Sequence, residues 1–135
     1  MMRRLAALAL ALGLAAAPAA ADPNAAIERV ISEQIAAFQR DDMAAAFEFA
    51  GPGIRQKFAT PENFGRMVRQ GYPMIHRPAR WEWRGLEGEG ATRVKTVLFE
   101  DACGALHEAD YLMGVVDGEW RIRGVRLRRL PGLSS

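Results

Sequence analysis

Cysteine, histidine and serine are scarce in this chain of 135 residues, and their scarcity argues against several kinds of active site. The one cysteine, Cys103, cannot form an internal disulfide, and two histidines with one cysteine give no recognisable zinc-binding spacing. After residue 21, serine occurs only at Ser32, within a predicted helix, and at Ser134 and Ser135. No phosphate-binding loop, nucleophile elbow or EF-hand sequence is present. We therefore expect no metal site, no cofactor and no serine nucleophile.

The first 21 residues have the order of parts found in a secretory signal peptide. Two arginines precede an apolar run of 13 residues, from Leu5 to Ala17, and small residues then lead to Ala21. The apolar run is too short to cross a bilayer comfortably, which takes about 20 residues. We expect cleavage near Ala21 and Asp22, no stable membrane anchor afterwards, and a periplasmic or secreted protein. A retained membrane anchor is the alternative.

Removal of residues 1–21 would leave 114 residues, a length typical of one domain, so we expect residues 22–135 to form a single domain. Arg3 and Arg4 depart with the signal peptide, which lowers the number of basic residues from 18 to 16 and makes it equal to the 16 acidic residues. A neutral protein has no overall field that attracts polyanions. The composition therefore argues against nucleic acid as a partner.

The hydrophobic pattern changes from helical to alternating near residue 79. Apolar residues in 27–38 recur at helical spacing, whereas those in 81–83 alternate with charged residues. Asp117-Gly118 is a typical two-residue hairpin turn. The pattern predicts helices over 22–42, 41–53 and 60–71, a further turn at 54–58, and strands over 79–86, 92–101, 105–118 and 119–130. We therefore expect an α+β fold in which N-terminal helices pack against a curved four-stranded antiparallel sheet.

The fourth predicted strand, EWRIRGVRLRRL, changes phase at Gly124. Trp120 and Ile122 before this glycine are even-numbered, whereas Val125 and Leu127 after it are odd-numbered. A one-residue slip at a glycine indicates a β-bulge, which places the apolar side chains of this strand on one face and its arginines on the other. We interpret the arginines as a solvated face paired with Glu108 and Asp110 of the neighbouring strand. A stripe that binds phosphate or lipid is the alternative.

Two segments resemble a known bacterial family. The run FAGPGIRQKFATPENFGRMVRQGYPMI (residues 49–75) and the run DGEWRIRGVRL (residues 117–127) are similar to domain of unknown function 4864, and the resemblance covers nearly all of the chain after residue 21. It implies the nuclear-transport-factor-2-like (NTF2-like) superfamily, also called ketosteroid isomerase-like or cystatin-like, in which a strongly bent antiparallel sheet wraps around helices as a cone. This superfamily contains isomerases, dehydratases and binding or assembly domains, so the fold by itself selects no activity.

No pair of residues gives a convincing acid/base site. Asp110 and Tyr111 are adjacent on a strand, so their side chains point to opposite faces. His107 and Tyr111 share the expected inner face with Val115, but four residues of strand separate them by about 13 Å, which is too far for a hydrogen bond. His107 also lies beside a predicted turn, where we expect it to be exposed.

Aromatic side chains are the remaining candidates for a binding site. If the cone encloses a cavity, we expect Tyr72, His76, Trp83 and Tyr111 to line it. His76 would lie at the rim, on the loop that enters the first strand. The alternatives are that the aromatic rings only pack in the core and that His76 is an ordinary surface residue. Cys103 falls in a predicted turn, as an incidental surface thiol, as a thiol that pairs with another chain, or as a reactive thiol.

These observations favour an exported binding protein without catalytic activity. Its expected partner is a small apolar ligand inside the cone or a protein on the sheet. One alternative is a small isomerase- or hydrolase-type enzyme of the ketosteroid isomerase-like kind. The other is a self-associating module, a homodimer in which two copies pair through the sheet.

Overall fold

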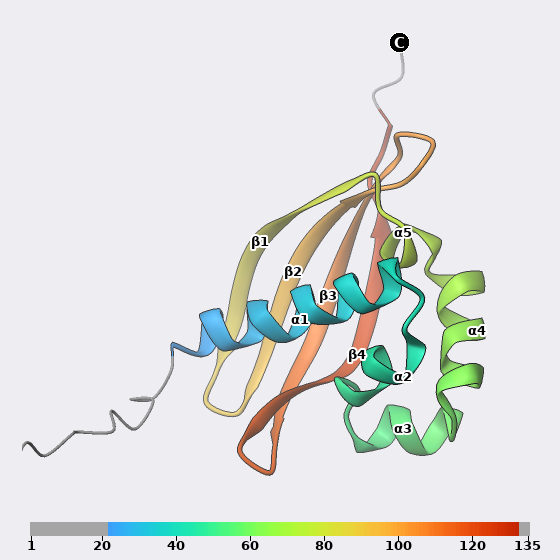
Figure 1. Ribbon diagram of the computed structural model, residues 1–135. Coiled ribbons are helices and arrows are strands. Elements are labelled where there is room, and N and C mark those ends of the chain that lie inside the picture. The colour runs from blue at the N-terminus through green and yellow to red at the C-terminus, as the bar shows by residue number, and fades with distance from the viewer. Residues whose placement is uncertain (1–21, 133–135) are drawn as a thin grey trace, which may run out of the picture.

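The computed structural model describes residues 22–132, and the predicted signal peptide over residues 1–21 lies outside them. Its helices are α1 (Pro23–Gln39), α2 (Met43–Glu48), α3 (Pro52–Phe58), α4 (Pro61–Gly71) and α5 (Pro73–His76). Its strands are β1 (Arg80–Glu89), β2 (Thr92–Glu100), β3 (Leu106–Val116) and β4 (Glu119–Arg129), as Figure 1 shows. The predicted α+β order is confirmed. The segment that became α5 was expected to be a loop, because a helix of four residues is too short to show helical periodicity.

Three of the helices begin at a side chain that caps the free backbone N–H groups of the first turn. The oxygen of Asp22 lies 3.1 Å from such a nitrogen in α1, that of Asp42 3.0 Å in α2, and that of Thr60 3.2 Å in α4. Each bond satisfies a donor that has no partner within the helix. Within residues 22–132, no helix has both the length and the apolar character needed to cross a bilayer.

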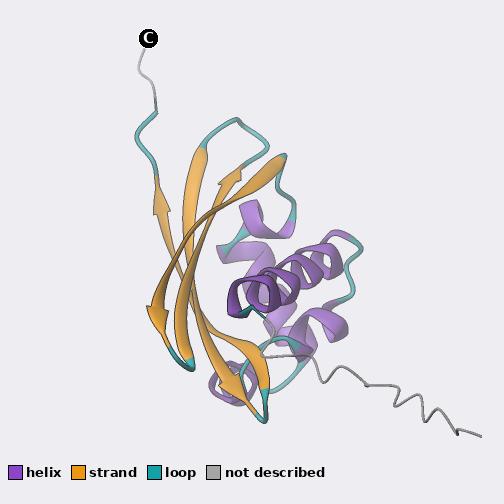
Figure 2. Ribbon diagram, turned by 90° about the vertical axis from the view of Figure 1, so that its left-hand side faces the viewer, coloured by secondary structure: helices purple, strands orange, loops and turns teal. Residues whose placement is uncertain are grey.

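The four strands form one antiparallel sheet in the order β1-β2-β3-β4. The sheet is bent, and all the helices lie on its concave side (Figure 2). The predicted hairpin joins β3 to β4 through Asp117 and Gly118, which both have positive φ, as this kind of tight turn requires. A register shift between Trp83 and Leu86 on β1 was not predicted. It is a second irregularity that bends the sheet around the helices.

The predicted bulge in β4 is present. Leu112 of β3 pairs with Gly124, whereas Met113 pairs with Ile122, so Arg123 is the extra residue on the bulged strand. Ile122 is buried, and the other apolar side chains of β4 pack against the core. The phase slip in the sequence therefore located the bulge correctly.

The segment that joins α2 to α3 pairs with β4 beside this bulge. The backbone N–H of Ile122 donates to the carbonyl of Phe49 (2.8 Å), and the N–H of Gly51 donates to the carbonyl of Ile122 (2.7 Å). The pairing holds α3 next to the sheet and sets the position of one wall of the pocket described below.

The hydrophobic core fills the space between the helices and the concave face of the sheet. Its largest fully buried side chains are Tyr111, Phe38, Phe99, Ile27, Ile31, Ile35, Met113, Ile122 and Val97. Val115 does not share this burial, although the alternation of β3 placed it on the inner face. Its side chain is 41% exposed because it lies near the β3–β4 hairpin, which extends beyond the helices (Figure 1).

Candidate functional site

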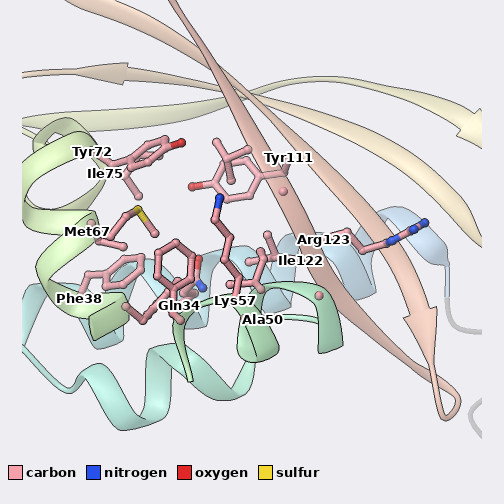
Figure 3. Close-up of a pocket in the computed structure, with 17 residues that line it drawn as sticks. Gln34, Phe38, Ala50, Lys57, Met67, Tyr72, Ile75, Tyr111, Ile122 and Arg123 are labelled. Atoms are coloured by element: carbon pink, nitrogen blue, oxygen red, sulfur yellow. The ribbon is translucent and has the colours of Figure 1, made fainter. Parts of the chain in front are cut away.

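A pocket of about 470 Å³ lies between helices α3 and α4 and strands β3 and β4 (Figure 3). Most of its lining is apolar, as is usual for sites that bind small molecules. The apolar residues of the lining are Phe38, Ala50, Ile54, Phe58, Phe64, Met67, Val68, Ile75, Ile122 and Val125. Two glycines and five residues with polar side chains complete it, namely Gly53, Gly124, Gln34, Lys57, Tyr72, Tyr111 and Arg123.

Tyr111 of β3 contributes a buried hydroxyl group to this pocket. Its side chain is fully buried, and within residues 22–132 the hydroxyl has no hydrogen-bond partner. Burial raises the pKa of the phenol, so the hydroxyl stays protonated at neutral pH and can donate a hydrogen bond. Figure 3 shows it pointing away from the sheet and into the pocket. A hydrogen-bond acceptor on a ligand would supply the missing partner.

The other polar side chains of the lining differ in whether their polar ends face the cavity and are free to bind a ligand. The amide of Gln34 is already occupied, because it donates to a backbone carbonyl of α2 at 3.1 Å. The polar ends of Lys57 and Tyr72 face the same space as the Tyr111 hydroxyl, whereas Arg123 extends away from the pocket (Figure 3). Three hydrogen-bond donors therefore face one apolar cavity.

The structure brings together two of the four residues predicted to line a cavity. Tyr72 and Tyr111 both belong to the lining, and His76 and Trp83 do not. Sequence reasoning did not single out Lys57, although it is one of only two lysines in the chain and lies one helical turn from Ile54. The lysine–apolar spacing in α3 was a usable signal for a cation at the edge of an apolar site.

Residues 20–134 match the family described as "Domain of unknown function (DUF4864)". The chain belongs to the DUF4864 family. The match confirms the resemblance of residues 49–75 and 117–127. No curated protein matches the DUF4864 chain.

Solved structures confirm the NTF2-like fold of the DUF4864 chain. An NTF2-like protein of unknown function from Silicibacter pomeroyi is similar to it with a TM-score of 0.57 and 17% sequence identity, over 79% of this chain and 95% of that one. A second NTF2-like protein of unknown function, from Burkholderia xenovorans, has a TM-score of 0.51 and 14% identity, over 83% of this chain and 88% of that one. At these identities the likeness establishes the fold and assigns no activity.

His76 of the DUF4864 chain lies outside the pocket lining because an aspartate holds it elsewhere. Its ring nitrogen is 2.7 Å from a carboxylate oxygen of Asp41, in the turn between α1 and α2. The other oxygen of Asp41 accepts from Arg77 at 2.5 Å, and a guanidinium nitrogen of Arg69 lies 3.6 Å from the oxygen that contacts His76. The hydrogen bond from His76, together with the nearby arginines, lowers the pKa of Asp41. His76 therefore connects two turns rather than forming the rim of the cavity.

Trp83 lies on the concave face as predicted, but at β1 and away from the pocket. Its ring packs edge-on against Trp81, with 4.8 Å between the ring centroids. The ammonium of Lys95 lies 5.2 Å from the centroid of the Trp83 ring. That ammonium also donates to Glu28 (2.7 Å) and Asn24 (2.8 Å) of α1. The aromatic pair thus belongs to the contact between α1 and the sheet.

The expectation that His107 is exposed is wrong, because it is only 8% exposed. Its ring nitrogen lies 2.8 Å from Asp101, whose other oxygen accepts from the backbone N–H groups of Cys103 (2.9 Å) and Ala105 (3.0 Å). One aspartate therefore organises the turn and covers the histidine, which the predicted turn alone did not indicate. Cys103 is exposed in that turn. Within residues 22–132, no three His, Cys, Asp or Glu side chains are grouped as a metal ion would require.

The convex face of the sheet carries the predicted pairs between β4 and β3. Arg128 donates to Asp110 and, at 2.9 Å, to Glu108. These bonds lower the pKa of Asp110 and raise that of Arg128. Arg121 pairs with Glu119 at the start of the same strand. Arg121 and Arg128 are thus paired with carboxylates, as the interpretation of a solvated face requires, whereas Arg123, Arg126 and Arg129 form no ion pair within residues 22–132.

These depressed carboxylate pKa values predict an acid-sensitive fold. Asp41, Asp101 and Asp110 all have a pKa below the usual 3.8 in the folded protein. Their contribution to the free energy of unfolding is therefore fully present at pH values above the usual aspartate pKa of 3.8. It is lost as the pH falls through the lower pKa values of the folded protein. The free energy of unfolding can be measured by urea denaturation at about pH 7, 5 and 3. Protonation of these carboxylates should lower it between about pH 5 and pH 3 and not between about pH 7 and pH 5. Asp110→Asn should lose less stability than the parent between the two lower pH values, and an equal loss would contradict the assignment.

Proposed function

We propose that the protein binds a small apolar molecule in the pocket between its helices and its sheet, after export and without catalysing a reaction. The observation that best supports this proposal is an apolar pocket of about 470 Å³ that contains the Tyr111 hydroxyl. This hydroxyl has no hydrogen-bond partner within residues 22–132. An apolar ligand with one polar atom would bury its body against the lining and satisfy that hydroxyl. The pocket favours this ligand over a protein partner on the sheet.

The composition of the lining supports binding rather than catalysis. General acid–base catalysis requires a proton acceptor and a donor within reach of the same substrate atom. The described lining contains no carboxylate and no imidazole. His76 and His107 both lie outside it, and each is hydrogen-bonded to an aspartate.

A larger side chain that fills the pocket should weaken binding, and Met67 is a suitable position for it. Met67 lines the pocket from α4, and tryptophan at this position would occupy much of the cavity. We expect the neutral fluorophore N-phenyl-1-naphthylamine to bind the parent protein saturably, and Met67→Trp to weaken its affinity by at least about tenfold. Fluorescence titration measures both, and the circular dichroism spectrum shows that the variant is folded.

Val115→Trp is the matched control for the added indole ring. Val115 is exposed and lies outside the lining, so this variant should bind the fluorophore like the parent. Absence of saturable binding by the parent would overturn the proposed function, and so would a folded Met67→Trp variant that binds as well as the parent. Turnover of a bound compound that depends on the lining residues would instead favour an enzyme.

Export is supported by the signal-like order of residues 1–21 and by the start of α1. Asp22 caps this helix, so cleavage after Ala21 would leave the capping residue in place. N-terminal sequencing of the protein recovered from the periplasm or the medium should begin at Asp22, and a retained residue 1 would contradict the proposal. Pairing of two copies through the convex face of the sheet stays a prediction.

A further inference from the structure

The polar side chains of the pocket are complementary to a negatively charged group. Tyr111, Tyr72 and Lys57 supply two hydroxyls and one ammonium, and all three face the same apolar space (Figure 3). From this arrangement we propose that the ligand is an amphiphile with a single anionic head, such as a carboxylate, on an uncharged apolar body. This inference rests on the proposed function, because it names the chemical class of ligand for the same pocket.

The charge in the pocket has no counter-ion within the described protein. The lining includes no aspartate or glutamate, and none of the ion pairs within residues 22–132 involves Lys57. Arg121 and Arg128 of β4 differ from Lys57 in this respect, because both pair with neighbouring carboxylates, whereas Arg123, Arg126 and Arg129 form no ion pair within residues 22–132. Lys57 is an exposed residue, so its ammonium stands at the open side of the pocket, where water screens its attraction for an anion.

The Tyr111 hydroxyl adds a directional contact to that charge. It is buried and protonated, and it has no partner within residues 22–132, so it can donate to a ligand oxygen without losing an existing bond. Hydrogen bonds to ionised acceptors are shorter and stronger than those to neutral ones. A carboxylate has two oxygens and room for several donors, which suits two hydroxyls and one ammonium.

The number of cations limits the charge of the ligand. Lys57 is the one cationic side chain of the lining that points into the cavity, since Arg123 extends away from it (Figure 3). A nucleotide or another multiply charged ligand would leave charges unpaired among the aromatic and aliphatic side chains, which is unfavourable. The ten apolar residues of the lining instead suit a single uncharged chain or ring system.

Decanoate and 1-decanol test the inference, because they share an apolar chain and differ in the head group. Each is titrated against the protein loaded with N-phenyl-1-naphthylamine, below its micelle-forming or solubility limit and at about pH 8, where the carboxylic acid is ionised. We expect decanoate to displace the fluorophore at a concentration at least about tenfold lower than decanol. The alcohol controls for the apolar contribution.

Three variants assign the preference to the residues that face the cavity. Lys57→Gln and Tyr111→Phe should each reduce the ratio of decanoate affinity to decanol affinity by about threefold or more, while decanol itself still binds. Arg55→Gln is the matched control, because it removes a cation from the same helix but outside the lining. Its ratio should equal that of the parent.

The outcomes separate this inference from the proposed function. Equal displacement by decanoate and decanol would overturn the anionic head while leaving an apolar binding pocket in place. A preference for decanoate that persists in Lys57→Gln and Tyr111→Phe would overturn the assigned residues and therefore the inference. Failure of the parent to bind the neutral fluorophore would reject the proposed function itself.

Discussion

Replacement of Lys95 by alanine is expected to lower the free energy of unfolding by about 3–5 kcal/mol. Lys95 is only 2% exposed, and it lies on the concave face of β2 opposite α1. Its ammonium donates to Glu28 at 2.7 Å and to Asn24 at 2.8 Å, and it stands 5.2 Å from the centroid of the Trp83 ring. The substitution removes these contacts, leaves a cavity, and strands the partly buried carboxylate of Glu28. Chemical denaturation followed by circular dichroism measures the loss.

A double-mutant cycle separates the ion pair from the packing of the lysine stem. Lys95→Met keeps much of the side-chain volume, and Glu28→Gln keeps the shape of the partner without its charge. Each single change should destabilise the protein, whereas the double variant should be less destabilised than the sum of the two, because no unpaired charge is left. Arg93→Met is the control on the same strand, since within residues 22–132 the Arg93 side chain bonds to the nearby Gly90 carbonyl and to no carboxylate. A cost below about 1 kcal/mol for Lys95→Ala would show that the buried pair does not hold α1 to the sheet.

The position of Lys95 in the sheet could be predicted from the sequence, but its partners could not. Lys95 alternates in phase with Val97 and Phe99, which are both fully buried, so the strand pattern places it on the concave face. Which side chains of α1 meet it depends on how the helix lies across the sheet. That orientation is set by tertiary packing, for which no local sequence signal exists.

The two bulges of the sheet, in β4 and in β1, have the same signal in the sequence. The slip at Gly124 was recognised and confirmed, whereas an equivalent slip in β1, where Trp83 is followed by Gly85 and Leu86, was overlooked. In both strands the apolar phase changes by one residue across a glycine. The second bulge was therefore predictable by the rule that found the first.

Two of the four residues predicted to line a cavity do line the pocket. The sequence indicates which residues lie on the concave face of the sheet, but not which part of that face the helices leave uncovered. Tyr72 and Tyr111 line the pocket, while Trp83, on the same concave face, is covered by α1 and Lys95. His76, the last residue of α5, lies outside the lining because its ring is hydrogen-bonded to the Asp41 carboxylate in the turn between α1 and α2. Contacts between residues this far apart in the chain follow from the fold and not from the neighbouring sequence.

The second large effect is expected at Tyr111, where the ring and the hydroxyl should act in opposite directions. Tyr111→Ala should lower the free energy of unfolding by about 3–5 kcal/mol, because it leaves a cavity beside Phe99 in the core. Tyr111→Phe keeps the ring and removes a buried hydroxyl without a partner in residues 22–132, so its stability should equal or exceed that of the parent by about 1 kcal/mol. Both values come from urea denaturation midpoints.

The pair of Tyr111 variants also tests whether this hydroxyl is kept for binding. A hydroxyl that destabilises the empty protein and strengthens ligand binding is what a functional site is expected to contain. Tyr111→Phe should therefore gain stability while losing part of its preference for decanoate over decanol. Phe99→Tyr offers the reciprocal control, since it buries a new hydroxyl in the core outside the lining and should destabilise without changing that preference. If Tyr111→Phe instead loses more than about 1 kcal/mol, the hydroxyl contributes to the folded state itself, and the argument that it awaits a ligand fails.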